Sequence, residues 1–96
     1  MTHPRATAIA NVDADGEFAE LLLKLPEAAV AVSIAGTFTG TVSLQRSFDG
    51  STWNTVQTWT GPVEATYLGD TCCKLRLGFA TGGYGSGDAD VRLQVG

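Results

Sequence analysis

The sequence predicts an all-β fold, a single antiparallel β-sandwich or small barrel of seven to eight short strands. Apolar and polar residues alternate with a period of two in most segments, whereas a 3.6-residue period is scarce. Turn-forming residues separate these segments, and 12 glycines against 3 prolines suit strands linked by hairpins. At 96 residues the chain is expected to form one domain over residues 1–96, with an extended N-terminal segment at 1–5.

Four strands are predicted in the N-terminal half: Ala6–Val12, Glu17–Leu25, Ala29–Phe38 and Thr41–Phe48. The second of these is ambiguous, because its large apolar residues also have helical spacing. We favour a strand there, with a helical turn as the alternative, since the run is short and has no clean N-cap. Gly36 and Gly40 predict a bend or bulge near the end of the third segment.

Four more strands are predicted in the C-terminal half: Trp53–Thr60, Glu64–Leu68, Cys72–Ala80 and Asp88–Val95. The glycine-rich segment Thr81–Gly87 between the last two has the composition of a loop. Alternation along the clearer strands also predicts which residues face the core. The predicted inward residues are Val30, Val32, Ile34, Val42, Leu44, Phe48, Leu75, Leu77, Phe79, Val91, Leu93 and Val95.

The strand Thr41–Phe48 has a polar outward face in this prediction. Its outward residues are Thr41, Ser43, Gln45 and Ser47. Arg46 falls on the inward side near the strand end, where its stem can pack while its head reaches solvent.

Asp49-Gly50 between two alternating runs is a strong hairpin signal, because both residues tolerate positive φ. The Asp49 side chain can also accept hydrogen bonds from the backbone amides that follow it. Trp53 starts the return strand and is expected to cover the hairpin. The stretch SFDGSTW around it resembles the Asp-box of sialidase propellers and a motif of discoidin-like β-sandwiches, but both resemblances end there and imply only a structural hairpin.

A broader resemblance covers most of the chain. It is carried by residues 30–47 (VAVSIAGTFTGTVSLQRS), the Asp-Gly turn, Trp53, residues 74–77 (KLRL), the glycine-rich segment and residues 91–93 (VRL). Together these segments look like small virion proteins of tailed bacteriophages. Residues 74–77 depart from the tyrosine-arginine-leucine usual in that group. The resemblance implies a β-sandwich structural protein that binds the capsid or tail and self-associates.

The net charge of −4, with six basic residues spread along the chain, argues against nucleic-acid binding, which requires clustered Lys and Arg. The N-terminus lacks the pattern of a signal peptide, and the longest apolar tract, Leu21–Ala35, is interrupted and too short to span a bilayer. We therefore expect no nucleic-acid or membrane partner.

Catalysis is not expected. The single histidine, His3, lies in the N-terminal segment, and the adjacent Cys72 and Cys73 are interpreted as reduced thiols without an identified activating partner. Acidic residues at 13, 15 and 17 and at 88 and 90 have oxygen ligands at alternate positions, but Lys24 stands where a calcium loop needs a bidentate glutamate. No cofactor or metal is expected.

The function predicted from the sequence is that of a virion structural protein made in the host cytoplasm. Within that class we favour a capsid decoration or cement protein that binds and stabilises the major capsid shell, as a homo-oligomer for which a trimer is one arrangement. A protein associated with the tail, head fibre or baseplate is the alternative. The predicted interface residues are Met1, Thr2, His3, Pro4, Arg5 and the exposed Tyr84.

A carbohydrate-binding β-sandwich module is the rival from another class. Trp53 and Trp59 are six residues apart, so a continuous strand would place both on one face. Tyr67 and Tyr84 could extend that aromatic platform. The opposing interpretation is that these aromatic residues pack in or against the core.

Overall fold

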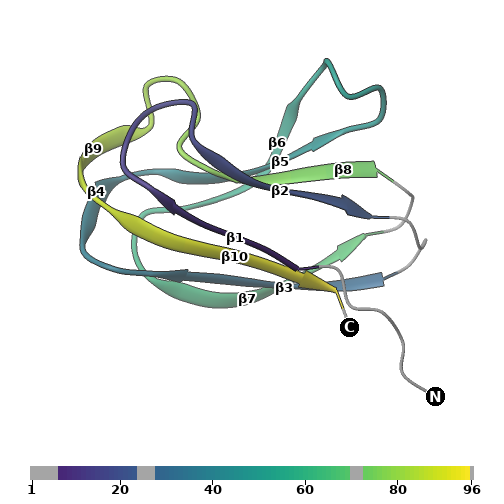
Figure 1. The fold of residues 1–96 in the computed structure, drawn as a ribbon, viewed down its shortest axis with the longest axis horizontal. Coiled ribbons are helices and arrows are strands. Elements are labelled where there is room, and N and C mark those ends of the chain that lie inside the picture. Colours follow the sequence, from purple (N-terminus) through teal and green to yellow (C-terminus); the bar gives the residue numbers. More distant parts are fainter. Residues whose placement is uncertain (1–6, 24–27, 70–72, 96) are drawn as a thin grey trace.

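The computed structural model describes residues 7–23, 28–69 and 73–95 (Figure 1). Over these residues the chain forms ten short strands in antiparallel pairs and no helix. The strands build two four-stranded sheets and a two-stranded one, and the sheets do not close into a barrel. The all-β sandwich prediction is therefore confirmed, with more strands than the seven or eight expected.

Two layers face each other in the fold, and Figure 1 shows them one above the other. Sheet A consists, in spatial order, of β1 (Thr7–Val12), β10 (Ala89–Val95), β3 (Ala28–Ala35) and β7 (Val63–Gly69). Sheet B consists of β2 (Phe18–Leu23), β8 (Cys73–Gly78), β5 (Val42–Ser47) and β6 (Asn54–Trp59). The two-stranded sheet pairs β4 (Phe38–Gly40) with β9 (Tyr84–Gly87).

The chain passes repeatedly between the layers. Among the described strands, only β5 and β6 are both consecutive in sequence and paired with each other. The ambiguous second segment is a strand, β2, rather than a helical turn. Its partner is β8, which is distant in the sequence.

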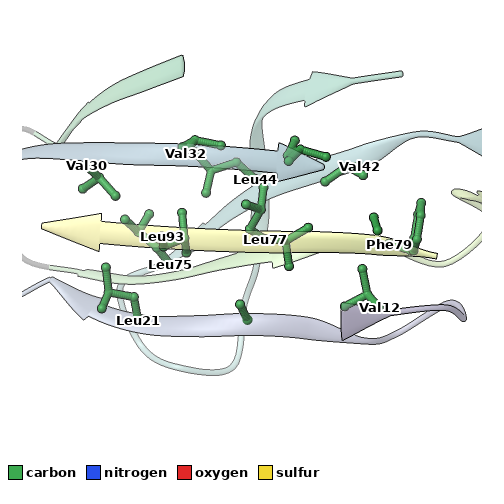
Figure 2. Packing of buried hydrophobic residues seen from close by; sticks show 14 residues of the cluster. Val12, Leu21, Val30, Val32, Val42, Leu44, Leu75, Leu77, Phe79 and Leu93 are labelled. Carbon is green, nitrogen blue, oxygen red and sulfur yellow. The ribbon is translucent and has the colours of Figure 1, made fainter. Parts of the chain in front are cut away.

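The core lies between sheets A and B, and side chains from both layers meet there (Figure 2). Its buried residues are Val12, Ala19, Leu21, Val30, Val32, Ile34, Val42, Leu44, Leu75, Leu77, Phe79, Ala89, Val91 and Leu93. The inward faces predicted from alternation are thus confirmed for ten of the twelve residues. Val95 is half-buried and packs against this core, whereas the prediction for Phe48 was wrong: β5 ends at Ser47, and the Phe48 side chain is 65% exposed.

The predicted strand Ala29–Phe38 is divided into β3 and β4, with Gly36 at a φ of 101° where the chain leaves sheet A. The glycine-rich segment that was predicted as a loop contains β9. A side chain at Gly85 would place its Cβ 2.5 Å from Thr39 Oγ1, so glycine allows β4 and β9 to approach closely. Glycine in this segment thus permits the pairing of β4 with β9, and a glycine-rich composition alone does not distinguish such a strand from a loop.

The strand β6 contains a bulge that overturns the predicted arrangement of the two tryptophans. Leu44 pairs with Gln57 and Gln45 with Thr55, so Val56 is an extra residue. An extra residue reverses the alternation of side chains along a strand. Trp59 consequently lies opposite the inward-facing Val42 and packs against the core, while Trp53 lies on the outer side of sheet B.

Candidate functional site

A row of polar side chains crosses the outer face of sheet B. Alternation on β8 places Leu75 and Leu77 in the core and Arg76 on the opposite, outer face. Arg76 pairs with Glu20 of β2 on one side and with Gln45 of β5 on the other. The Arg76 Nε donates to Gln45 Oε1 at 2.7 Å, and Gln45 Nε2 donates to Thr55 Oγ1 at 3.1 Å. Hydrogen bonds between outward side chains thus connect β8, β5 and β6.

The guanidinium of Arg76 also contacts two aromatic rings. Its Cζ lies 4.1 Å from the centroid of Phe18 and 4.2 Å from that of Trp53. Phe18 belongs to β2 and Trp53 to the loop before β6, so the rings come from opposite sides of β8. We call Phe18, Arg76 and Trp53 the Arg76 stack. Cation–π contacts of this kind contribute about 0.5–2 kcal/mol each and hold the guanidinium in one orientation.

Burial and a neighbouring carboxylate act on Arg76 in opposite directions. Desolvation lowers the pKa of the Arg76 guanidinium, and the nearby Glu20 raises it. The polar residues of β5 do face outward as predicted, but Ser43, Gln45 and Ser47 are buried rather than solvated. For Gln45 the hydrogen bonds above compensate the lost hydration.

A close backbone approach positions Phe18 for the stack. A Cβ on Gly78 would lie 2.0 Å from the carbonyl oxygen of Glu17, so only glycine leaves room for the start of β2. Backbone hydrogen bonds join the same region, from Phe79 N to Glu17 O at 3.2 Å and from Gly16 N to Phe79 O at 2.8 Å. Gly78 therefore fixes the position of one of the two rings.

The predicted hairpin at Asp49-Gly50 is present, between β5 and β6. Asp49 Oδ1 accepts hydrogen bonds from the amides of Thr52 and Ser51 and from the Ser47 hydroxyl. These bonds hold the pKa of Asp49 well below its ordinary value of 3.8. Gly50 has a φ of 83°. These hydrogen bonds order the turn that precedes Trp53.

Arg46 connects the layers near this loop. Its side chain is half-buried on the inward side of β5, as predicted, and Nη1 donates to the hydroxyl of Tyr67 on β7 at 3.3 Å. Its guanidinium also lies 4.9 Å from the centroid of the Phe48 ring.

The aromatic platform proposed for sugar binding is not assembled. Trp59 and Tyr67 pack against the core, and Trp53 is on the other face of sheet B. Tyr84, predicted to be exposed, is half-buried: its ring meets Phe79 edge to face at a centroid distance of 5.1 Å. Its amide donates to Asp15 and its hydroxyl to the carbonyl oxygen of Gly87. Tyr84 therefore packs against neighbouring residues, whereas the glycine-rich segment around it had predicted an exposed side chain.

Four of the five acidic residues considered as metal ligands, Asp15, Glu17, Asp88 and Asp90, accept hydrogen bonds from the protein. Asp15 binds the amides of Gly82 and Tyr84, which lowers the pKa of Asp15. Asn11 Nδ2 donates to both Asp88 and Asp90. In the described part of the chain, no group of three or more His, Cys, Asp or Glu residues is arranged to hold a metal ion.

Several sequence predictions concern residues outside the described ranges. They are the interface residues Met1, Thr2, His3, Pro4 and Arg5, and the thiol of Cys72. Within the described ranges, no helix has the length and apolar character needed to cross a membrane.

The Arg76 stack was not predicted from the sequence. The alternation of β8 marks Arg76 as outward-facing, and that was the available signal. The contact partners follow only from the pairing of β2, β8 and β5, which lie far apart in the sequence. Comparisons of the chain with protein families, with curated proteins and with solved structures found no match.

Proposed function

We propose that the chain is a structural protein of the virion of a tailed bacteriophage and acts by binding other virion proteins rather than by catalysis. The resemblance of residues 30–47, the Asp-Gly turn and the downstream strands to small phage virion proteins supports the class. The sandwich fold agrees with what that resemblance implies. In the most specific form of the proposal, the chain is a decoration or cement protein that binds the major capsid shell and self-associates.

The observation that carries the proposal is the outer face of sheet B. It combines the Arg76 stack with Leu22, whose side chain is 50% exposed. Tryptophan and arginine are enriched among the residues that dominate protein–protein binding energy. A rigid stack costs little side-chain entropy on docking, because its rotamers are already held. Many copies on a repeating shell would add such modest contacts together.

Counting the protein in purified mature particles tests this proposal. A decoration protein should be present in many regularly placed copies, seen by quantitative mass spectrometry and by image reconstruction of the particle. A handful of copies at the tail, fibre base or baseplate would support the alternative location and overturn the decoration role. Absence from particles would overturn the virion assignment altogether.

A further inference from the structure

We propose that the outer face of sheet B docks on an acidic protein surface, with Arg76 donating two parallel hydrogen bonds from Nη1 and Nη2 to a carboxylate of the partner. This inference rests on the proposed function, that the chain works by binding a virion protein. It adds the chemistry that the partner must present.

The guanidinium of Arg76 is held in place, but not all of its hydrogen-bond donors have an acceptor among the described residues. Its Nε bond to Gln45 and the two rings restrain it. Among the described residues, Nη1 and Nη2 have no hydrogen-bond acceptor. Two donors in a fixed planar fork match the two oxygens of a carboxylate. The restraint means that little further ordering is needed when the partner arrives.

The charge of the surrounding face favours an acidic partner. The charged side chains that point outward from the described strands of sheet B are Lys74, Arg76 and Glu20. Lys74 and Arg76 are two residues apart on β8, so both lie on this outer face. The strands of this face therefore carry two positive charges and one negative charge on a chain whose net charge is −4, and the ionised Asp49 lies in the adjacent loop beside Ser47. That net charge disfavours nucleic acid as the source of the anion, and the planar fork of Arg76 suits a carboxylate of a protein partner.

Glu20 provides a test whose direction is specific to this proposal. Glu20 lies opposite Arg76 on the neighbouring strand β2, and its carboxylate would repel an incoming carboxylate. Removing the charge with Glu20→Gln should therefore strengthen binding about threefold, as expected for two unit charges about 6 Å apart in water. A misfolded variant would bind more weakly, so tighter binding cannot come from loss of structure.

The experiment measures binding of the purified protein to phage particles that lack it, by co-sedimentation over a range of protein concentrations. Arg76→Lys keeps the charge but loses the planar fork, and should weaken binding about tenfold. The matched control is Arg92→Lys on the exposed outer side of sheet A, which should bind like wild type. Thermal unfolding of each variant checks that it remains folded.

The outcomes separate this inference from the proposed function. Wild-type protein that does not bind particles overturns both. If wild type binds but Arg76→Lys binds equally well, or Glu20→Gln binds more weakly, the carboxylate contact is overturned while the virion role stands. Weaker binding of Arg76→Lys together with tighter binding of Glu20→Gln supports the inference.

Discussion

At the scale of single residues, Asp49 organises the β5–β6 loop through one oxygen atom. Oδ1 accepts bonds of 2.7 Å from the Thr52 amide, 2.8 Å from the Ser51 amide and 3.0 Å from the Ser47 hydroxyl. The Ser47 hydroxyl in turn accepts the Gly50 amide at 2.8 Å. The ionised carboxylate is the better acceptor for these bonds, so protonation should weaken the loop.

The pH dependence of stability follows from this. The pKa of Asp49 is lower in the folded chain than its ordinary value of 3.8, so folding favours the ionised form. Its contribution should be fully present above about pH 5 and decrease as the pH falls through 3.8 toward the lower folded pKa. Urea unfolding of the wild type and of Asp49→Asn at several pH values measures this contribution to the free energy of unfolding. The two stabilities should converge in acid, and a constant difference across the acid range would contradict this role.

Two phenylalanines that the sequence presents alike should differ greatly in their contribution to stability. Phe79 is fully buried and meets both Phe38 and Tyr84 edge to face. Phe79→Ala should cost about 3–5 kcal/mol of unfolding free energy. Phe48→Ala is the matched control, because Phe48 is mostly exposed, and should cost less than about 1 kcal/mol. Equal losses in urea unfolding would show that the Phe48 side chain is buried after all.

At the scale of the elements, the edge strand β2 depends on the absence of a side chain at Gly78. A Cβ there would overlap the Glu17 carbonyl, a backbone atom that cannot move without shifting β2. Gly78→Ala should therefore cost about 1–3 kcal/mol and increase amide hydrogen exchange in β2 more than in β3.

Gly61→Ala is the control for that substitution. Gly61 has open space around its Cβ position and lies outside the strands, so this change should alter stability by less than about 0.5 kcal/mol. If Gly78→Ala were as mild as Gly61→Ala, the close packing of β2 on β8 would be wrong.

The elements also show where sequence-based prediction succeeds. Alternation identified Val30, Val32 and Ile34 as core residues because each strand carries its own period-two pattern. The bulge at Val56 leaves no comparable pattern, since it arises from pairing between β5 and β6. The strand β9 also lacks a local signal, and its glycine composition predicted a loop. It forms because it pairs with β4, as the hydrogen bond between Thr39 and Ser86, 47 residues apart, illustrates.

At the scale of the whole molecule, the candidate site is a product of topology. Arg76 lies between β2 and β5 because the sheet order is β2-β8-β5-β6, and this order is not readable from a chain in which neighbouring strands mostly belong to different sheets. A hairpin such as β5–β6 is predictable because its turn is local. The long-range pairings that bring Phe18, Arg76 and Trp53 together have no local signal of that kind.

The two tryptophans allow binding and stability to be separated in the intact molecule. Trp59 packs against the core, so Trp59→Ala should cost about 2 kcal/mol, less than a fully buried tryptophan. Trp53 lies on the outer face against Arg76, so Trp53→Ala should cost about 1 kcal/mol or less.

Only Trp53→Ala should weaken binding to phage particles beyond its effect on folding, because it removes one side of the Arg76 stack. Urea unfolding and co-sedimentation of the same two variants measure both quantities. If Trp59→Ala, still folded at the assay temperature, lost binding while Trp53→Ala kept it, the binding surface would have to be assigned away from the outer face of sheet B.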